Sequence, residues 1–196
     1  KYNSNNNWGW LEGNKNKLLK MNLGDIRDFD FVDNSLKNCD AVLHLAALIG
    51  IPYSYISPLA YINTNIIGTY NILESCRKNE IKNVVVTSTS EVYGSSQYEP
   101  MDERHPTVSQ SPYAASKKSA DELAISYYKS FKLPVKIIRP FNTYGPRQSA
   151  RAIIPSIAFQ LLNKNIKSVK IGNLSPMRDY TYVGDLCDAY FKILKS

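Results

Sequence analysis

Residues 83–94 read NVVVTSTSEVYG, and this stretch decides the fold. The β-branched run from Asn83 to Ser90 is typical of a strand buried on both faces of a parallel sheet. Glu91 follows directly, at the carboxyl end of that strand. Ligands bind at the carboxyl ends of strands in open α/β sheets, although an ordinary loop also begins with a polar residue there. The position alone leaves both interpretations of Glu91 open.

Strand patterns and helix patterns alternate along the chain on both sides of this stretch. The patterns predict strands at residues 18–23, 41–47, 83–89 and 135–140, and helices at residues 28–38, 57–79 and 111–131. The last two helices open with Ser-Pro, an N-cap followed by a proline at the first helical position. Repeated strand–helix–strand units predict an α/β doubly wound fold with a parallel sheet and right-handed crossovers.

The alternation weakens after Pro140. A loop rich in Pro, Asn and Gly leads to a predicted helix near residues 151–163, a short strand at 169–172 and a last helix from Gly184. We therefore expect a first domain over residues 1–146 and the start of a smaller subdomain over residues 147–196, with a crossover helix that returns to the first domain.

Composition bounds the function classes. The chain has 196 residues, a formal charge of +7 and a pI near 9.2, which fits either nucleic acid or anionic small molecules as partners. The lysines are scattered and no aromatic residues are interleaved with them, which disfavours nucleic acid. The 3 cysteines form no metal-binding pattern, so no metal is expected. Without a long apolar run or a signal sequence, we expect a cytoplasmic protein with no membrane partner.

Two motifs bear on a nucleotide partner. None of the 9 glycines forms a GxGxxG or GxxGxxG loop, so either the protein binds no dinucleotide or the chain lacks the first βαβ unit. YAASK places Tyr113 and Lys117 at i and i+4 of a helix, where the cation would lower the pKa of the phenol and make it a general base. A second match, Tyr128 with Lys132, lies near a helix end without polar neighbours in the sequence.

The motifs TSTSEVYG, YAASK, HLAA, NTNIIGTYNILE and RPFNTYGPR occur together. Their combination resembles the extended short-chain dehydrogenases of the NAD-dependent epimerase/dehydratase family over essentially the whole chain. The resemblance implies a Rossmann domain with tightly bound, recycled NAD or NADP, and a smaller carboxyl-terminal domain for a nucleotide sugar. It also implies that the glycine-rich unit would precede Lys1 and that more of the substrate domain would follow Ser196.

The same resemblance implies a role for individual residues. The implied catalytic residues are Thr89, Ser90, Glu91, Tyr113 and Lys117; the implied cofactor-binding residues are Asp25, Ile26, Leu45, Ala46, Ala47, Asn65 and Thr87, together with Tyr113 and Lys117; the implied substrate-binding residues are Asn142, Arg147 and Arg178. Residues 1–4, which are basic and hydroxyl-bearing, favour NADP over NAD. The helices at 57–79 and 111–131 imply a homodimer.

Glu91 then indicates a 4,6-dehydratase, because a ketone at C4 acidifies the C5 proton that a carboxylate removes. Simple 4-epimerases need no such base. Ser90 departs from the dTDP-glucose dehydratases, which have an aspartic acid there, and Glu91 is expected to act as both base and acid. UDP-glucuronate decarboxylases share Thr-Ser-Glu and remain an alternative, as do a 4-epimerase and a non-catalytic Rossmann-like protein. Segments around residues 2–14, 46–58 and 91–117 most resemble the hexosamine 4,6-dehydratases of legionaminic acid biosynthesis, which implies UDP- or GDP-N-acetylglucosamine as substrate.

Overall fold

The computed structural model describes residues 8–196. The residues that bear on NADP, 1–4, lie outside the described part of the chain. The chain divides into two compact units, Lys1–Arg139 and Pro140–Ser196. The division falls shortly before the domain boundary predicted at residue 146, and the assignment of the second unit to substrate binding stays a prediction.

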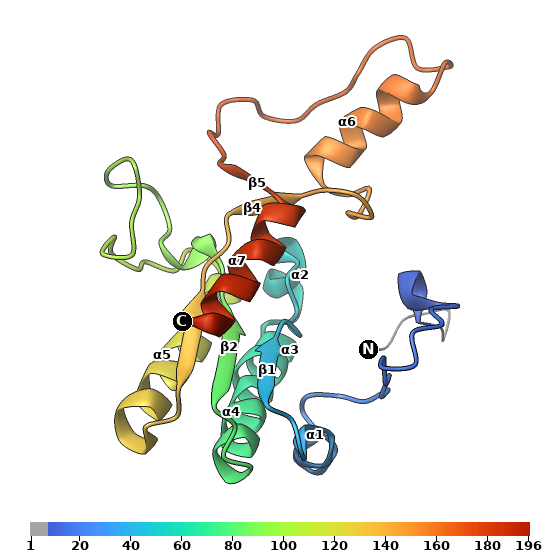
Figure 1. Ribbon diagram of the computed structural model, residues 1–196. Helices are drawn as coiled ribbons and strands as arrows, with labels where there is room; N and C mark the ends of the chain where they lie inside the picture. The colour runs from blue at the N-terminus through green and yellow to red at the C-terminus, as the bar shows by residue number, and fades with distance from the viewer. Residues whose placement is uncertain (1–7) are drawn as a thin grey trace. The chain divides into compact units, whose positions relative to one another are not determined.

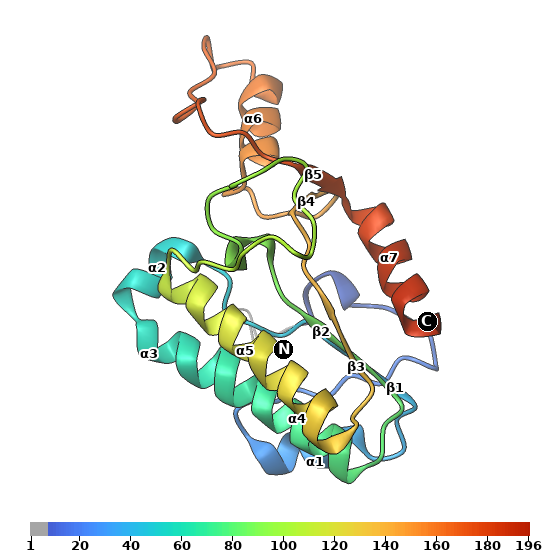
Figure 2. The ribbon, with the colours of Figure 1, turned by 90° about the vertical axis from the view of Figure 1, so that its left-hand side faces the viewer.

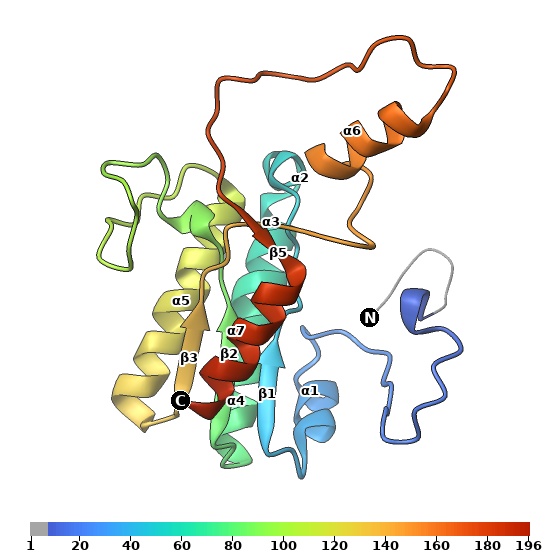
Figure 3. The same cartoon turned by 45° about the horizontal axis from the view of Figure 1, so that its top comes forward.

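A parallel sheet forms the centre of the first unit. Its described strands are β1 (Ala41–His44), β2 (Asn83–Thr87) and β3 (Val135–Ile138), in the order β1-β2-β3. Val84 lies opposite Val42 on one side and Val135 on the other, so β2 is central and its valines are fully buried. The arrows of β1, β2 and β3 point the same way in Figure 3, and their carboxyl ends share one edge. The predicted α/β fold with a parallel sheet is confirmed.

Two long helices, α4 (Gly68–Lys78) and α5 (Pro112–Phe131), lie side by side on one face of this sheet (Figures 1 and 2). Between helices and sheet lies the core, which includes Leu73, Cys76 and Ala124. Complete burial of a leucine such as Leu73 contributes about 1.5–3 kcal/mol to folding. A shorter helix, α1 (Phe29–Leu36), packs on α4, and the Asp28 carboxylate caps it by accepting from Phe31 N.

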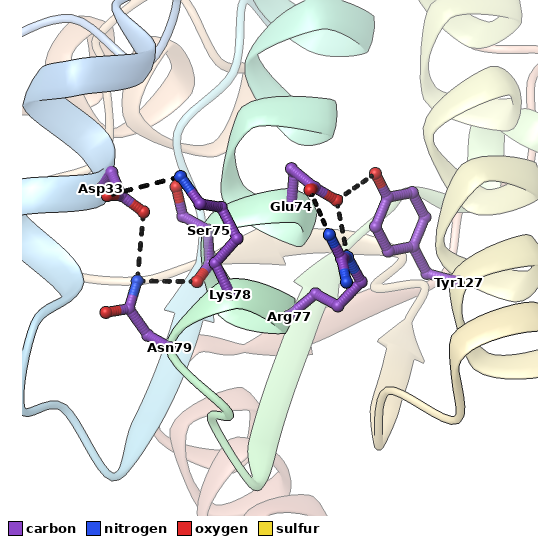
Figure 4. Close-up of polar contacts among 7 residues, drawn as sticks. All are labelled: Asp33, Glu74, Ser75, Arg77, Lys78, Asn79 and Tyr127. Atoms are coloured by element: carbon purple, nitrogen blue, oxygen red, sulfur yellow. Dashed lines mark hydrogen bonds and ion pairs between the residues drawn. The ribbon is translucent and has the colours of Figure 1, made fainter.

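Polar contacts at the end of α4 hold it between its two neighbours (Figure 4). The Glu74 carboxylate accepts from Arg77 at 2.6 Å and from the Tyr127 hydroxyl of α5 at 3.0 Å. On the other side, Asn79 donates to the Asp33 carboxylate of α1 at 3.1 Å. These contacts fix the spacing of the helices that carry the candidate site.

The helix predicted at 57–79 has an irregular first half. Short helices α2 (Ile51–Ile56) and α3 (Pro58–Tyr61) precede a π-helical turn, η2 (Ile62–Ile67), which runs into α4. The Ser57 N-cap makes no side-chain capping bond. In contrast, the Ser111 hydroxyl accepts from Ala114 N at 3.0 Å, as the Ser-Pro motif of α5 predicts.

The second unit contains a parallel pair of short strands, β4 (Asn142–Tyr144) and β5 (Tyr180–Tyr182). Its helices are α6 (Ile153–Leu162) and α7 (Val183–Lys195), which agree with the two predicted from sequence. The sequence patterns did not predict β4 or β5, because three-residue strands are too short to show a period.

Two predicted strands are wrong. Residues 18–23 form no strand: Leu18 is exposed, and Asn16 accepts hydrogen bonds from the Leu18 and Leu19 amides, through its side chain and its carbonyl respectively. Such local bonds compete with a strand that has no neighbour to pair with. Residues 169–172 are likewise irregular, and the Lys170 amide bonds to Gln160 of α6 instead. A short helical turn, η1 (Gly9–Leu11), lies near the start of the described residues. No helix within residues 8–196 is long and apolar enough to cross a membrane.

Candidate active site

Glu91 lies in a one-turn helix, η3 (Ser90–Val92), that follows β2. The Thr89 hydroxyl caps this turn by accepting from the Glu91 amide at 3.3 Å, and Val92 is fully buried beneath it. Gly94 ends the motif with φ of 71°, and a Cβ there would lie 2.3 Å from the Val108 carbonyl oxygen. The stretch TSTSEVYG therefore forms a fixed turn that holds Glu91, half-buried, at the carboxyl edge of the sheet.

Tyr113 lies in the first turn of α5 and is buried beside Thr89. Burial raises the pKa of the Tyr113 phenol above its usual value; the hydrogen bond with Thr89 opposes this, and the Glu91 carboxylate adds to the rise. The lowered pKa predicted from Lys117 is therefore wrong for this structure, because burial prevails. The Tyr61 ring packs edge-on against Tyr113 at 6.2 Å between centroids.

Lys117 is buried one helical turn after Tyr113, and its ammonium group donates to the Thr87 carbonyl oxygen at 2.6 Å. Burial lowers the pKa of Lys117 to about 8, and the carboxylate of Asp121 opposes that shift. The competing YxxxK pair does not resemble this arrangement, because Tyr128 and Lys132 are both exposed. The choice of Tyr113 over Tyr128 agrees with their surroundings.

Leu45, Ala46 and Ala47, which are predicted to form a wall beside the cofactor, directly follow β1. Leu45 is 57% exposed and Ala46 is also exposed, so apolar surface is open at the carboxyl end of this strand. Asn65, in the π-helical turn, holds Leu48, the residue that follows this wall. The Asn65 side chain accepts from Leu48 N at 2.8 Å and donates to Leu48 O at 3.0 Å. It also donates to the Ser116 hydroxyl of α5 at 2.9 Å.

Asn65 is 1% exposed, so its side chain positions the wall from behind and does not line a groove. The π-helical turn has a second consequence, because the Asn65 carbonyl accepts from the Thr69 hydroxyl at 2.6 Å. Because the Thr69 hydroxyl hydrogen is donated to Asn65 O, the Thr69 oxygen accepts from His44 Nε2 at 3.0 Å. The proton of the neutral imidazole therefore lies on Nε2. Burial, followed by the charge of Lys117, lowers the pKa of His44 to about 3.

Asp25 and Ile26, the predicted adenine-binding pair, are anchored on α4. Asn71 donates to the Ile26 carbonyl oxygen at 2.9 Å, and the absent side chain of Gly68 leaves room for Ile26, whose Cδ1 would lie 2.5 Å from a Cβ. The Asp25 carboxylate is exposed and pairs with Arg27 at 2.6 Å, and hydrogen bonds from Arg27 lower its pKa. The motif NTNIIGTYNILE thus supports two of the segments predicted to bind the cofactor, a role that sequence reasoning missed.

The predicted substrate residues lie in the second unit. Asn142 opens β4, and its amide donates to the Asp179 carbonyl at 3.2 Å, so the segment that carries Arg178 runs beside it. Arg178 is exposed. Arg147 adopts φ of 70° in the loop after β4. The strand pairing therefore brings Asn142 and Arg178 into neighbouring segments.

Comparisons with known proteins agree with this geometry. The family model described as GDP-mannose 4,6 dehydratase matches residues 1–196. This chain belongs to the GDP-mannose 4,6-dehydratase family. The family lies within the NAD-dependent epimerase/dehydratases, as the sequence motifs predicted.

Among the relatives of this family member is a dTDP-D-glucose 4,6-dehydratase of Dictyostelium discoideum, 38% identical over 190 residues that cover 90% of this chain and 44% of the relative. The chain spans about half the length of the curated relatives it matches, for example 49% of the enzyme from Streptomyces antibioticus.

Two solved structures are also similar to this member of the GDP-mannose 4,6-dehydratase family. The UDP-N-acetylglucosamine 4-epimerase of Methanobrevibacter ruminantium, in complex with UDP-N-acetylmuramic acid, has a TM-score of 0.87 and 33% identity over 93% of this chain and 59% of its own. DesIV of Streptomyces venezuelae, a dTDP-glucose 4,6-dehydratase with NAD and TYD bound, has a TM-score of 0.81 and 32% identity over 88% of this chain and 53% of its own. The neighbours thus agree with the predicted nicotinamide cofactor.

Proposed function

We propose that this chain carries the catalytic centre of a sugar-nucleotide 4,6-dehydratase, a lyase that converts UDP- or GDP-N-acetylglucosamine to its 4-keto-6-deoxy form. The observation that carries the proposal is the placement of Glu91 in the turn capped by Thr89, while Thr89 also contacts Tyr113. A carboxylate, a hydroxyl and a phenol thereby meet at one strand end, which is the set that C5 deprotonation and C4 oxidation require.

The residues at the sheet edge fit a nicotinamide cofactor. Leu45 and Ala46 offer exposed apolar surface, Asp25 offers an exposed carboxylate, and Lys117 supplies an ammonium group beside Tyr113. A nicotinamide held there would supply hydride acceptance at C4 and hydride donation at C6. The preference for NADP, which rests on residues 1–4, stays a prediction, and a smaller Kd for NAD than for NADP would contradict it.

In the proposed reaction, Tyr113 in its phenolate form accepts the proton of the O4 hydroxyl, which Thr89 orients. The resulting C4 ketone acidifies the C5 proton, and Glu91 removes it. Glu91 then delivers that proton to the leaving C6 hydroxyl, so water departs and a C5–C6 double bond remains. Return of the hydride to C6, together with a solvent proton at C5, completes the 4-keto-6-deoxy sugar with no net oxidation. Ser90 is a much weaker acid than a carboxylate, and this favours Glu91 as the group that serves both steps.

Three alternatives differ from the dehydratase in the outcome of an assay. A UDP-glucuronate decarboxylase would lose carbon dioxide from C5, and a 4-epimerase would return the hydride to C4. A non-catalytic nucleotide-binding protein would show no turnover. We propose that the dehydratase acts in legionaminic acid or another surface-glycan biosynthesis, because of the segments that resemble the hexosamine enzymes. Its proposed location is the cytoplasm.

The test incubates the full-length protein in D2O with UDP-N-acetylglucosamine, GDP-N-acetylglucosamine, UDP-glucuronate and dTDP-glucose in separate reactions. Mass spectrometry and NMR follow the products. Loss of water with deuterium at C5 from a hexosamine substrate supports the proposal and selects the nucleotide. Dehydration of dTDP-glucose alone would contradict the substrate assignment, and loss of carbon dioxide or epimerisation would replace the reaction.

Glu91→Gln tests the shuttle, and Glu122→Gln on the exposed side of α5 is its matched control. We expect the first variant to lose both dehydration and C5 exchange, by about 10²–10⁴-fold, and the second to keep them. Full exchange in Glu91→Gln would reject this residue as the base.

The predicted homodimer has exposed apolar residues at its proposed surface. Tyr70 on α4, and Tyr128 and Phe131 on α5, are 42%, 57% and 53% exposed. We propose that α4 and α5 pair with the same helices of a second copy. Light scattering of the full-length protein should give twice the monomer mass, and a monomer at micromolar concentration would reject the pairing.

A further inference from the structure

Asp121 is a buried carboxylate that the proposed reaction does not use. It follows Lys117 by one turn of α5, so the two side chains share a helix face, and it is 1% exposed. Arg139, at the end of β3, donates from Nε to the Asp121 carboxylate at 2.9 Å. A buried charge is retained only when it is paired. The pairing here joins the helix of Lys117 to the last residue before the second unit.

Arg139 also reaches the turn that carries Glu91. Its Nη1 donates to the Tyr93 hydroxyl at 3.1 Å, and its guanidinium lies over the Tyr93 ring at 5.1 Å. Tyr93 directly follows η3, and its amide donates to the Ser90 carbonyl. The ion pair of buried Asp121 with partly buried Arg139 therefore connects the two elements that supply the proposed catalytic groups.

The charges around Lys117 make Asp121 its anionic partner. Asp121 is the carboxylate that favours the charged form of Lys117, whereas burial disfavours it. The imidazole of His44, from β1, is neutral, and the Thr87 carbonyl of β2 accepts the ammonium hydrogen. Around Asp121 itself stand Ser88, Arg139 and Lys117, each of which lowers its pKa against the effect of burial. The Glu91 carboxylate of η3 raises the pKa of Tyr113.

We propose that Asp121, anchored by Arg139, is a positioning residue: it holds Lys117 as an ammonium group on Thr87 O and, through Arg139 and Tyr93, holds the turn of Glu91. Its effect on turnover rests on the proposed function, whereas its effect on Lys117 does not. Sequence reasoning had no reason to join residues 121 and 139.

The first experiment follows Lys117 directly. Full-length protein is labelled with [ε-13C]lysine, and the Cε resonance assigned with a Lys117→Met variant is titrated by NMR. We expect Asp121→Asn to lower the pKa of Lys117, and Glu122→Gln to leave it unchanged. An unchanged pKa in folded Asp121→Asn would overturn the proposal, whether or not the protein turns over any sugar nucleotide.

Asp121→Asn leaves Arg139 without its anion, so a second variant guards against misfolding. The double variant Asp121→Asn/Arg139→Gln removes both charges, and it should lower the pKa of Lys117 less than the single variant does. A pKa at or above the wild-type value in the folded double variant would also overturn the proposal.

The second experiment separates positioning from a purely structural role. At neutral pH, Asp121→Asn should lower kcat about tenfold, with a smaller change in KM. The alkaline limb of the curve of kcat against pH should move to lower pH, since Lys117 loses its proton at a lower pH in this variant. Asp121→Glu should restore part of the rate. An equal loss at every pH, with no movement of the limb, would mean that Asp121 only supports the fold.

Discussion

The Lys117 ammonium group donates a hydrogen bond of 2.6 Å to the carbonyl oxygen of Thr87, the last residue of β2. A helix side chain is thereby fixed to the end of the central strand, where the turn of Glu91 begins. The packing of α5 against the sheet consequently sets the distance between the ammonium group, Tyr113 and Glu91.

Lys117→Met should abolish turnover and change the pH dependence of stability. The folded pKa of about 8 lies below the ordinary 10.5, so the unfolded chain binds more protons between these values. Wild-type stability therefore gains from Lys117 as pH rises from 8 to 10.5, and the buried charge costs most below pH 8. The Tm of the variant minus that of wild type should be more positive at pH 7 than at pH 10. A difference that grows with pH would contradict the buried charge.

Asn65→Ala should detach Leu48, and with it the wall at residues 45–47, from α5. It removes two bonds to partly buried Leu48 and one to buried Ser116, each worth about 0.5–1.5 kcal/mol. We expect the free energy of unfolding to fall by about 2–4 kcal/mol and the Kd for the cofactor to rise. Asn34→Ala, on the exposed side of α1, is the control and should change neither. Denaturant unfolding and calorimetric titration give both quantities.

Gly68→Ala should weaken cofactor binding through Ile26. The new Cβ would lie 2.5 Å from the Ile26 side chain, so the segment of Asp25 and Ile26 must move away from α4. We expect a several-fold rise in the Kd for the cofactor, with a loss of about 1–3 kcal/mol in stability. Gly172→Ala meets no atom within 4 Å and serves as the control. Equal affinity in the two variants would show that Ile26 does not contribute.

His44→Gln should reduce acid sensitivity. The folded pKa of His44 is lowered to about 3 from 6.5, so the unfolded chain binds the extra proton between these values, and stability falls as pH drops through that window. Glutamine keeps a donor for Thr69 without taking up a proton. The Tm of the variant should therefore fall less than that of wild type between pH 6.5 and 5. Parallel Tm curves would contradict a neutral buried His44.

Local pattern was sufficient for much of the fold. The valines of β2, the Ser111 cap of α5 and the helical patterns of α1 and α4 were each visible in a short window of sequence. The same kind of window failed at residues 18–23 and 169–172, where apolar alternation is present but no strand lies alongside to complete a ladder. It also failed at η2, because a π-helical turn has no distinct apolar period.

The sequence by itself determined which groups stand at the site: Thr89 and Glu91 follow a buried strand, and Tyr113 and Lys117 open a capped helix. These placements depend on neighbours a few residues away. The tertiary structure alone decided what surrounds these groups: Lys117 on Thr87 O, Asn65 behind the wall, and Asp121 paired with Arg139. It also reversed the expected pKa shift of Tyr113. The physical reason is that burial and charge pairing depend on residues brought together from distant parts of the chain, which no local pattern contains.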